Sequence, residues 1–341
     1  MSTANVTAST SEHPPDRSAV LAVRDLSVAA GQRRLVEEVG FTIHAGERVG
    51  LIGESGSGKS LTALSLMGLL PGELTATGSA RLGDHDLLSG DEAALSQVRG
   101  KDIAMVFQEP MTALNPTMRV GHQVAEALLI HRARTDRRSA HAGAVELLAQ
   151  VGLPDPAVVA HAYPHQFSGG QRQRIMLAIA LANDPALLIC DEPTTALDVT
   201  VQAMILDLVV RGVEQRNSAL LFITHDLAVV ATVCERVLVM YGGRIVESGP
   251  VLEVFTRPRH PYTQGLIATS DLAVVDARGR LATIRGSVPP AGEFPAGCVF
   301  RNRCDHATQA CADRPPWTEL GDETGYACFH PVTHSRRGFD D

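Results

Sequence analysis

The residues best suited to chemistry in this chain form one loop, Gly53-Glu54-Ser55-Gly56-Ser57-Gly58-Lys59-Ser60. The run fits the pattern G-x-x-x-x-G-K-[ST], in which glycines let consecutive backbone N–H groups turn toward a bound phosphate. A lysine at position 59 would reach the β and γ phosphates of a nucleotide, and a hydroxyl at position 60 would bind magnesium. We therefore predict that residues 53–60, with Leu61 immediately after them, form a nucleotide site.

Polar groups that end three apolar segments fit the hydrolysis of a nucleotide. Asp191 and Glu192 follow residues 186–190, His225 follows residues 220–224, and Gln108 ends the segment that begins at residue 103. Hydrolysis needs a metal ion and a group that polarises the attacking water. We predict that Asp191, Ser60 and Gln108 hold magnesium and that Glu192 is the general base. Gln108 would sense the γ phosphate through metal and water, and His225 would sense it by a direct hydrogen bond.

Plain structural roles for these residues stay open at this point. Glu192 is also explained as an acidic helix cap, and Gln108 and His225 as ordinary hydrogen-bonded residues at strand ends. Only their order and spacing relative to the loop favour the chemical interpretation.

The segments around these groups predict an α/β fold. Residues 49–52 are typical of a short buried strand, and residues 59–70 predict a helix with Leu61, Leu64 and Leu69 facing inward. The loop would then lie at a helix N-terminus, where the helix dipole favours an anion. Residues 186–190 and 220–224 predict buried parallel strands, and ligands of such sheets bind at the carboxyl ends of the strands.

Other segments complete the predicted organisation. Strands are expected at residues 20–28, 39–44, 78–82 and 103–107, and a hairpin at residues 236–247 around Gly242-Gly243. From Val120 the apolar residues change to helical spacing, which predicts a helical insertion. Gly169 and Gly170 precede an apolar-faced helix at residues 172–182, which suggests a second anion site. Residues 1–18 lack apolar periodicity and are predicted to be a disordered tail.

Composition narrows the class of protein. The 341 residues are 45% apolar, enough for one large domain and a smaller one. The sequence predicts neither a membrane span nor a secretory signal, and hence a protein that stays in the cytoplasm. A net charge of −8 and a pI near 5.9 argue against nucleic acid as a partner, because phosphate backbones require a basic surface.

Taken together, the motifs resemble an ATP-binding cassette (ABC). The resemblance covers about residues 20–265 and implies a P-loop NTPase fold with a RecA-like core, an antiparallel β subdomain and an α-helical subdomain at about residues 110–170. It rests on residues 53–60, Gln108, residues 167–171, 188–192 and 196–198, and His225. Phe167 stands where leucine is commoner, and Ala29 or Ala30 stands where the family usually has an aromatic residue that stacks on adenine.

The family implies roles that spacing alone does not show. Two ATPase subunits would sandwich ATP and Mg²⁺ head to tail, so the signature Ser168, Gly169, Gly170 and Gln171 would act in trans on the partner's loop. Asp198, in the matching loop between subunits, would help to couple the two sites. Gln108 would sit where nucleotide state is transmitted to membrane partners.

A finer resemblance, to the ATP-binding subunits of dipeptide and oligopeptide importers, a group that also includes nickel importers, comes from residues 106–116, 191–202 and 260–263. It implies a subunit bound to the cytoplasmic face of the inner membrane. Its partners would be two transmembrane permease subunits, a second ATPase subunit, identical or different, and indirectly an extracytoplasmic solute-binding protein. The alternatives are an importer of nickel or another small solute and a soluble ABC ATPase without a transport role.

The finer resemblance also implies a C-terminal extension at residues 266–341 that carries Cys298, Cys304, Cys311 and Cys328. Four thiolates suit a four-iron four-sulfur (4Fe-4S) cluster or a structural zinc, and the family favours the cluster. No pair has the two-residue gap typical of zinc ribbons or ferredoxins, so free thiols or a disulfide also stay open. Cys190, by contrast, lies in a predicted apolar strand and Cys234 in a predicted helix, and both are predicted to be buried core thiols.

Overall fold

The computed structural model describes residues 18–108, 113–195, 197–270, 283–321 and 323–333. Four predicted features therefore lie partly outside the described residues: the N-terminal tail except Ser18, residues 109–112 of the importer-like motif, residue 196 of the inter-subunit loop, and residues 271–282, 322 and 334–341 of the extension.

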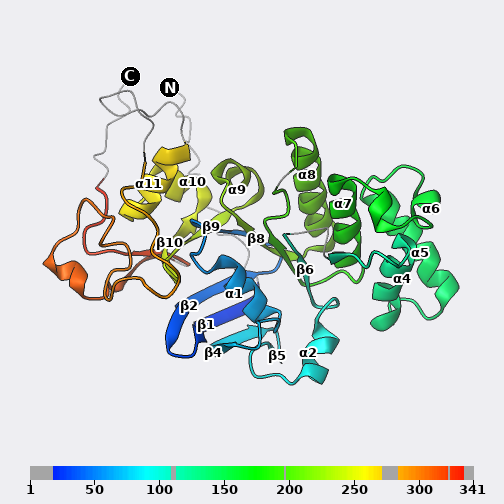
Figure 1. Cartoon of the computed structure of the whole chain (residues 1–341), viewed down its shortest axis with the longest axis horizontal. Helices are drawn as coiled ribbons and strands as arrows, with labels where there is room; N and C mark the ends of the chain where they lie inside the picture. The colour runs from blue at the N-terminus through cyan, green and yellow to red at the C-terminus, as the bar shows by residue number, and fades with distance from the viewer. Residues whose placement is uncertain (1–17, 109–112, 196, 271–282, 322, 334–341) are drawn as a thin grey trace, which may run out of the picture.

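Two sheets organise the described residues (Figure 1). The first is antiparallel, with strand order β2-β1-β4-β5. The second has the order β11-β12-β10-β9-β3-β8-β7-β6, and β9, β3, β8, β7 and β6 run parallel in it. The strands are β1 (Ala19–Ala30), β2 (Arg33–His44), β3 (Arg48–Ile52), β4 (Leu74–Leu82), β5 (His85–Asp86), β6 (Ile103–Val106), β7 (Leu187–Asp191), β8 (Ala219–Thr224), β9 (Arg236–Tyr241), β10 (Arg244–Pro250), β11 (Trp317–Gly321) and β12 (Thr324–Ala327).

Helices cover the second sheet, and a group of them forms one end of the molecule in Figure 1, where α4, α5 and α6 lie beside α7. This group contains the predicted helical insertion. The helices are α1 (Lys59–Leu66), α2 (Glu92–Val98), α4 (Val120–Ile130), α5 (Arg137–Gln150), α6 (Pro156–Val159), η1 (Pro164–Gln166), α7 (Gly169–Ala180), α8 (Val199–Arg216), α9 (Leu227–Val233), α10 (Val251–Thr256), α11 (Pro261–Ser270) and η2 (Gln309–Ala312). Among the described helices, none combines the length and apolarity needed to cross a bilayer.

Only part of the predicted inward face of the first helix packs against the core, where Leu61 does so. Leu69 is exposed and lies beyond α1, which ends near Gly68 at a φ of 61°, and Leu61 and Leu64 are half-buried. The fully buried positions include Thr62 and Ser65. Their hydroxyls donate to the carbonyls of Gly58 and Leu61, one turn earlier, so they enter the core without an unsatisfied polar group.

The two predicted core thiols are both buried, although Cys234 lies just after a helix rather than in it. Cys190 ends the apolar run of β7 and Cys234 follows α9, and both are buried. Burial raises the pKa of Cys190 far above its usual value and that of Cys234 to about 12, so both thiols stay protonated.

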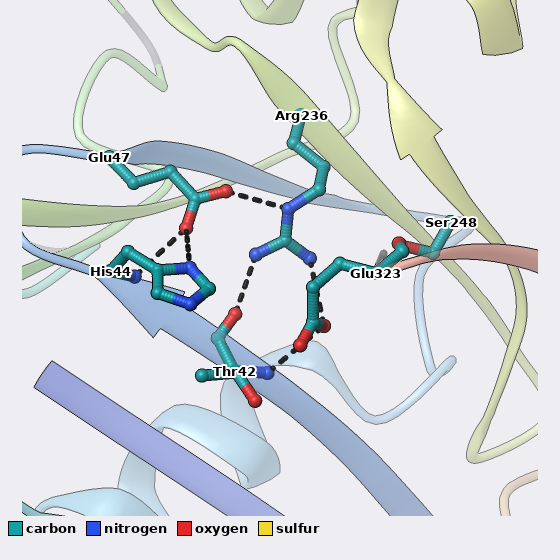
Figure 2. Close-up of polar contacts among 6 residues, drawn as sticks. All are labelled: Thr42, His44, Glu47, Arg236, Ser248 and Glu323. Carbon is teal, nitrogen blue, oxygen red and sulfur yellow. Dashed lines mark hydrogen bonds and ion pairs between the residues drawn. The ribbon is translucent and has the colours of Figure 1, made fainter. Parts of the chain in front are cut away.

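The C-terminal extension continues the second sheet, because β12 pairs antiparallel with β10 and β11 pairs with β12. A buried arginine fixes this junction (Figure 2). Arg236 Nε donates to Glu47 Oε1 at 2.7 Å, Nη1 lies 3.5 Å from Glu323 Oε2, and Nη2 donates to the Thr42 carbonyl at 2.5 Å. The Ser248 hydroxyl donates to the Glu323 carbonyl at 2.6 Å. One guanidinium therefore joins β2, the turn before β3 and the turn between β11 and β12.

Candidate functional site

The predicted phosphate-binding loop, residues 53–60, follows β3 and runs into the first turn of α1, in the position that the sequence predicts. Gly53, Gly56 and Gly58 have φ values of 157°, 79° and 104°, a range that residues other than glycine rarely adopt. A Cβ on Gly53 would lie 2.1 Å from the Met240 carbonyl oxygen. The Gly243 amide, in the predicted turn between β9 and β10, donates to the Ser57 carbonyl at 3.0 Å. The β9–β10 hairpin therefore packs against the loop and hydrogen-bonds to it.

Lys59 is buried beneath this loop. Its Nζ donates to the carbonyls of Gly53 at 2.8 Å and Glu54 at 3.1 Å. Burial lowers the pKa of Lys59 below its usual value, while the charges of Glu192, Asp191 and Glu54 oppose that shift. Burial therefore outweighs these three charges, and a bound phosphate would add further negative charge beside the ammonium.

The polar groups predicted at three strand ends meet at Glu192. Gln108 Nε2 donates to Glu192 Oε2 at 3.4 Å, and His225 Nδ1 lies 3.2 Å from Glu192 Oε1. The Thr195 hydroxyl also donates to Oε2, at 2.9 Å. Glu192 has a φ of 46°, a conformation that residues other than glycine seldom adopt and that is common at functional sites. A plain helix cap does not explain this convergence.

Asp191 has the features of a cation ligand. It is 5% exposed, and among the described residues its Oδ1 has no hydrogen-bond partner. Burial raises the pKa of Asp191, and a hydrogen bond from the Ser60 hydroxyl opposes that shift. An orphaned buried carboxylate oxygen beside a hydroxyl suits Mg²⁺, which prefers oxygen ligands. The residues present therefore fit the ion.

The remaining predicted nucleotide residues divide by burial. Ser55, Gly56 and Ser60 are exposed, whereas Ser57 is buried and its hydroxyl has no partner among the described residues. Leu61 packs against the core that lies between the antiparallel sheet and α1. Ala29 and Ala30 are the last two residues of β1, and both are half-buried. Neither of them can stack on adenine as an aromatic side chain would.

The signature residues form the N-terminus of α7. The Ser168 hydroxyl accepts from the Gln171 amide at 3.4 Å, and Gln171 Oε1 accepts from the Ser168 amide at 2.9 Å, which is a capping box. Gly170 has a packing role that sequence reasoning missed, because a Cβ there would lie 2.4 Å from Val201 Cγ1 on α8. Asp198 caps α8 by accepting from the Val201 amide at 3.0 Å.

The four cysteines of the extension gather without forming a metal site. Burial raises the pKa of the Cys328 thiol to about 11, and the nearby thiols of Cys298, Cys304 and Cys311 raise it as well. The amide of Cys298 donates to the Cys311 carbonyl at 3.1 Å. Across the described ranges, however, no three His, Cys, Asp or Glu side chains are placed to hold a metal ion. The predicted 4Fe-4S cluster and its zinc alternative are therefore not supported.

Comparisons with known proteins agree with this geometry. Residues 36–195 match the family model described as ABC transporter, and residues 246–311 match the oligopeptide/dipeptide transporter C-terminal region. The oligopeptide transport ATP-binding protein OppD of Escherichia coli is 45% identical to this chain, and the alignment covers 92% of this chain and 94% of OppD. The dipeptide transport ATP-binding protein DppD of the same organism is 43% identical, and the alignment covers 94% of this chain and 99% of DppD.

A Brucella melitensis protein named as a peptide import ATP-binding protein is 49% identical, over 86% of this chain and 90% of its own. Among solved structures, a dimeric bacterial ABC transporter cassette aligns with a TM-score of 0.61 and 27% identity, covering 68% of this chain and 98% of that one. The predicted resemblance is confirmed: the chain belongs to the ATP-binding proteins of ABC transporters, in the group that ends in the oligopeptide/dipeptide transporter C-terminal region.

Proposed function

We propose that this chain is the ATP-hydrolysing subunit of an importer of di- or oligopeptides. The names of its relatives support the transport role, and the convergence of Gln108 and His225 on Glu192 supports hydrolysis. That convergence is the observation that carries the proposal, because three strand ends bring it together beside the phosphate-binding loop.

In this proposal residues 53–60 surround the triphosphate. Backbone amides of the loop and the N-terminus of α1 face the phosphates, and Lys59 exchanges its bonds to the Gly53 and Glu54 carbonyls for β and γ phosphate oxygens. Ser60, Asp191 and Gln108 would hold Mg²⁺. The ion would neutralise charge on the phosphate oxygens.

Glu192 is the proposed general base. Its carboxylate takes a proton from water as the water oxygen attacks the γ phosphorus and the bond to ADP breaks. Gln108 and His225 hold the carboxylate in place before the nucleotide arrives. The imidazolium form of His225 has two donors, so it can bond to Glu192 and a γ phosphate oxygen together.

Hydrolysis in this proposal requires two subunits. In Figure 1 α7 lies apart from α1, beyond β6, which supports a signature (Ser168, Gly169, Gly170 and Gln171) that acts on the partner's nucleotide. Two ABC cassettes that align with this chain are dimeric, one of them bound to ADP and Pi, which supports an assembly of two subunits. Asp198, at the start of α8, would couple the two sites.

The proposed assembly places this subunit on the cytoplasmic face of the membrane. Its partners are two permease subunits and a second ATPase subunit, with a solute-binding protein outside that delivers the peptide.

The proposed domains are a tail at residues 1–18, the ATPase domain at 19–265 and the extension at 266–341. Iron analysis and absorbance near 400 nm of anaerobically purified protein would check the cluster prediction, and zinc analysis its alternative.

Two variants test the proposed chemistry. Glu192→Gln should bind MgATP with wild-type affinity while steady-state hydrolysis falls by about 10² to 10⁴-fold, the usual contribution of a general base. Lys59→Ala should lose MgATP binding. Normal hydrolysis by Lys59→Ala protein would overturn the proposed site, and retained turnover by Glu192→Gln would show that another group is the base.

A further inference from the structure

The phosphate-binding loop contains a carboxylate that its function does not explain. Glu54 is the second residue of the loop, and its charge is among those that act on the Lys59 ammonium. A negative charge at this position opposes the approach of a polyphosphate, since like charges repel strongly in a partly buried site. The loop therefore needs a cation to offset Glu54.

Arg303 of the C-terminal extension supplies that cation. Its Nη1 donates to Glu54 Oε2 at 2.5 Å and its Nη2 to Oε1 at 3.1 Å, a two-point contact that fixes both position and orientation. The two residues are 249 positions apart. The side chain of Arg303 is 6% exposed and that of Glu54 24%, so solvent screens this pair only in part.

The extension and β9 together hold Arg303 in one position. Its Nε donates to the Arg285 carbonyl at 2.9 Å, and its Nη1 lies 3.3 Å from the Tyr241 hydroxyl. The guanidinium carbon lies 5.7 Å from the centroid of the Tyr241 ring. With its donors engaged in this way, the guanidinium presents a fixed fork to Glu54.

A second contact fixes the backbone of the same loop residue. The Glu54 amide donates to the Tyr262 hydroxyl of α11 at 2.8 Å. The Tyr262 ring packs on the Tyr241 ring, with 4.6 Å between the two ring centroids. Both the side chain and the amide of Glu54 are thus held by segments that follow β9. The extension and α11 act on one residue of the nucleotide site.

We infer that Arg303 is a positioning residue for MgATP: by neutralising and orienting Glu54, it lets the C-terminal extension set the nucleotide affinity of the phosphate-binding loop. This inference rests on the proposed function, because it concerns the same nucleotide. It goes beyond it in assigning the extension a part in ATP binding.

Arg303→Met tests the inference, with Arg301→Met, in the same loop, as the matched control. We expect Arg303→Met to raise the KM for MgATP about tenfold, as an unscreened charge near a phosphate would, while kcat changes by less than about twofold. Arg303→Lys should show a smaller increase, and Arg301→Met should behave as wild type. Thermal unfolding of each variant shows whether it is folded.

A charge-specific rescue separates positioning from a merely structural ion pair. Adding Glu54→Gln to Arg303→Met should restore the KM for MgATP, because the uncompensated carboxylate is gone. A wild-type KM in folded Arg303→Met protein, or no restoration in the double variant, would overturn the inference. Should Arg303→Met fail to fold, Glu54→Gln alone decides: MgATP binding weaker than wild type contradicts the electrostatic role.

Failure of this inference is distinguishable from failure of the proposed function. If Lys59→Ala abolishes binding and Glu192→Gln abolishes turnover while Arg303→Met leaves KM unchanged, only the role of Arg303 is wrong. If Lys59→Ala protein hydrolyses ATP normally, the proposed function itself is wrong.

Discussion

Glu192 and His225, which directly follow the neighbouring strands β7 and β8, meet with 3.2 Å between Oε1 and Nδ1. This contact predicts that His225→Ala lowers kcat for ATP by about 10²-fold, the contribution of one well-placed catalytic group, with little change in MgATP affinity. Steady-state kinetics measure both values. His306→Ala, an exposed histidine of the extension, is the control. An unchanged kcat in His225→Ala protein would show that the contact has no catalytic role.

Gly170 predicts a steric effect at the start of α7. The added methyl of Gly170→Ala meets the stiff Val201 side chain, so the free energy of unfolding should fall by about 1 to 3 kcal/mol, the usual cost of overpacking. Val201→Ala in the same chain removes the obstructing methyl groups and should recover that stability. Urea unfolding of the single and double variants tests this. Equal instability in both would mean that the clash is not the cause.

Arg236 predicts a large loss of stability when its charge is removed. Burial raises the pKa of Glu47, but hydrogen bonds and the charge of Arg236 outweigh burial and hold that pKa below its usual value. Arg236→Met leaves this carboxylate buried without its arginine partner, with only the contacts of His44 remaining among the described residues, which costs about 3 to 5 kcal/mol. Thermal unfolding should show the loss, and Arg236→Met with Glu47→Gln should recover part of it. Arg24→Met, at an exposed position, is the control, and an equal loss there would contradict the assignment.

His260 predicts a loss of stability in acid. Burial lowers its pKa from 6.5 to about 3, and its Nδ1 accepts a hydrogen bond from the Tyr262 amide at 3.0 Å, so the folded ring is neutral. Below about pH 6.5 His260 binds a proton in the unfolded chain but stays neutral in the folded chain. The free energy of unfolding therefore falls as the pH falls from about 6.5 toward 3. The loss attributable to His260 at pH 5 is about 2 kcal/mol.

His260→Asn checks this pH dependence, because an amide oxygen still accepts the Tyr262 bond but does not titrate. The melting temperature of the variant should fall less steeply between pH 7 and pH 5 than that of the wild type. His306→Ala should keep the wild-type slope. Parallel slopes for His260→Asn and wild type would show that His260 does not set the acid sensitivity.

Much of the site could be predicted because its signals are local. The glycines and Lys59 of the loop stand in fixed order, and the strand-end positions of Gln108, Glu192 and His225 follow from short apolar runs. Parallel strands bring their carboxyl ends to one edge, so residues far apart in sequence were expected to meet there, and they do.

The errors and omissions have physical reasons. The inward face of α1 was predicted only in part, because Thr62 and Ser65 satisfy their hydroxyls within the helix and so bury like apolar residues. The Arg303–Glu54 pair had no local signal, since any arginine of the extension is an equal candidate until the chain is folded. Four cysteines gave a composition that suits a cluster, but composition does not specify how the thiols are arranged.

The pairing of β12 with β10 has a consequence for any attempt to shorten the protein. A chain cut after Gly265 would leave β10 as an open sheet edge, ready to pair with a neighbouring molecule. The same cut would take Glu323 from Arg236 and Arg303 from Glu54. The C-terminal extension is therefore an integral part of the fold, and a shortened version of this ATPase has to include it.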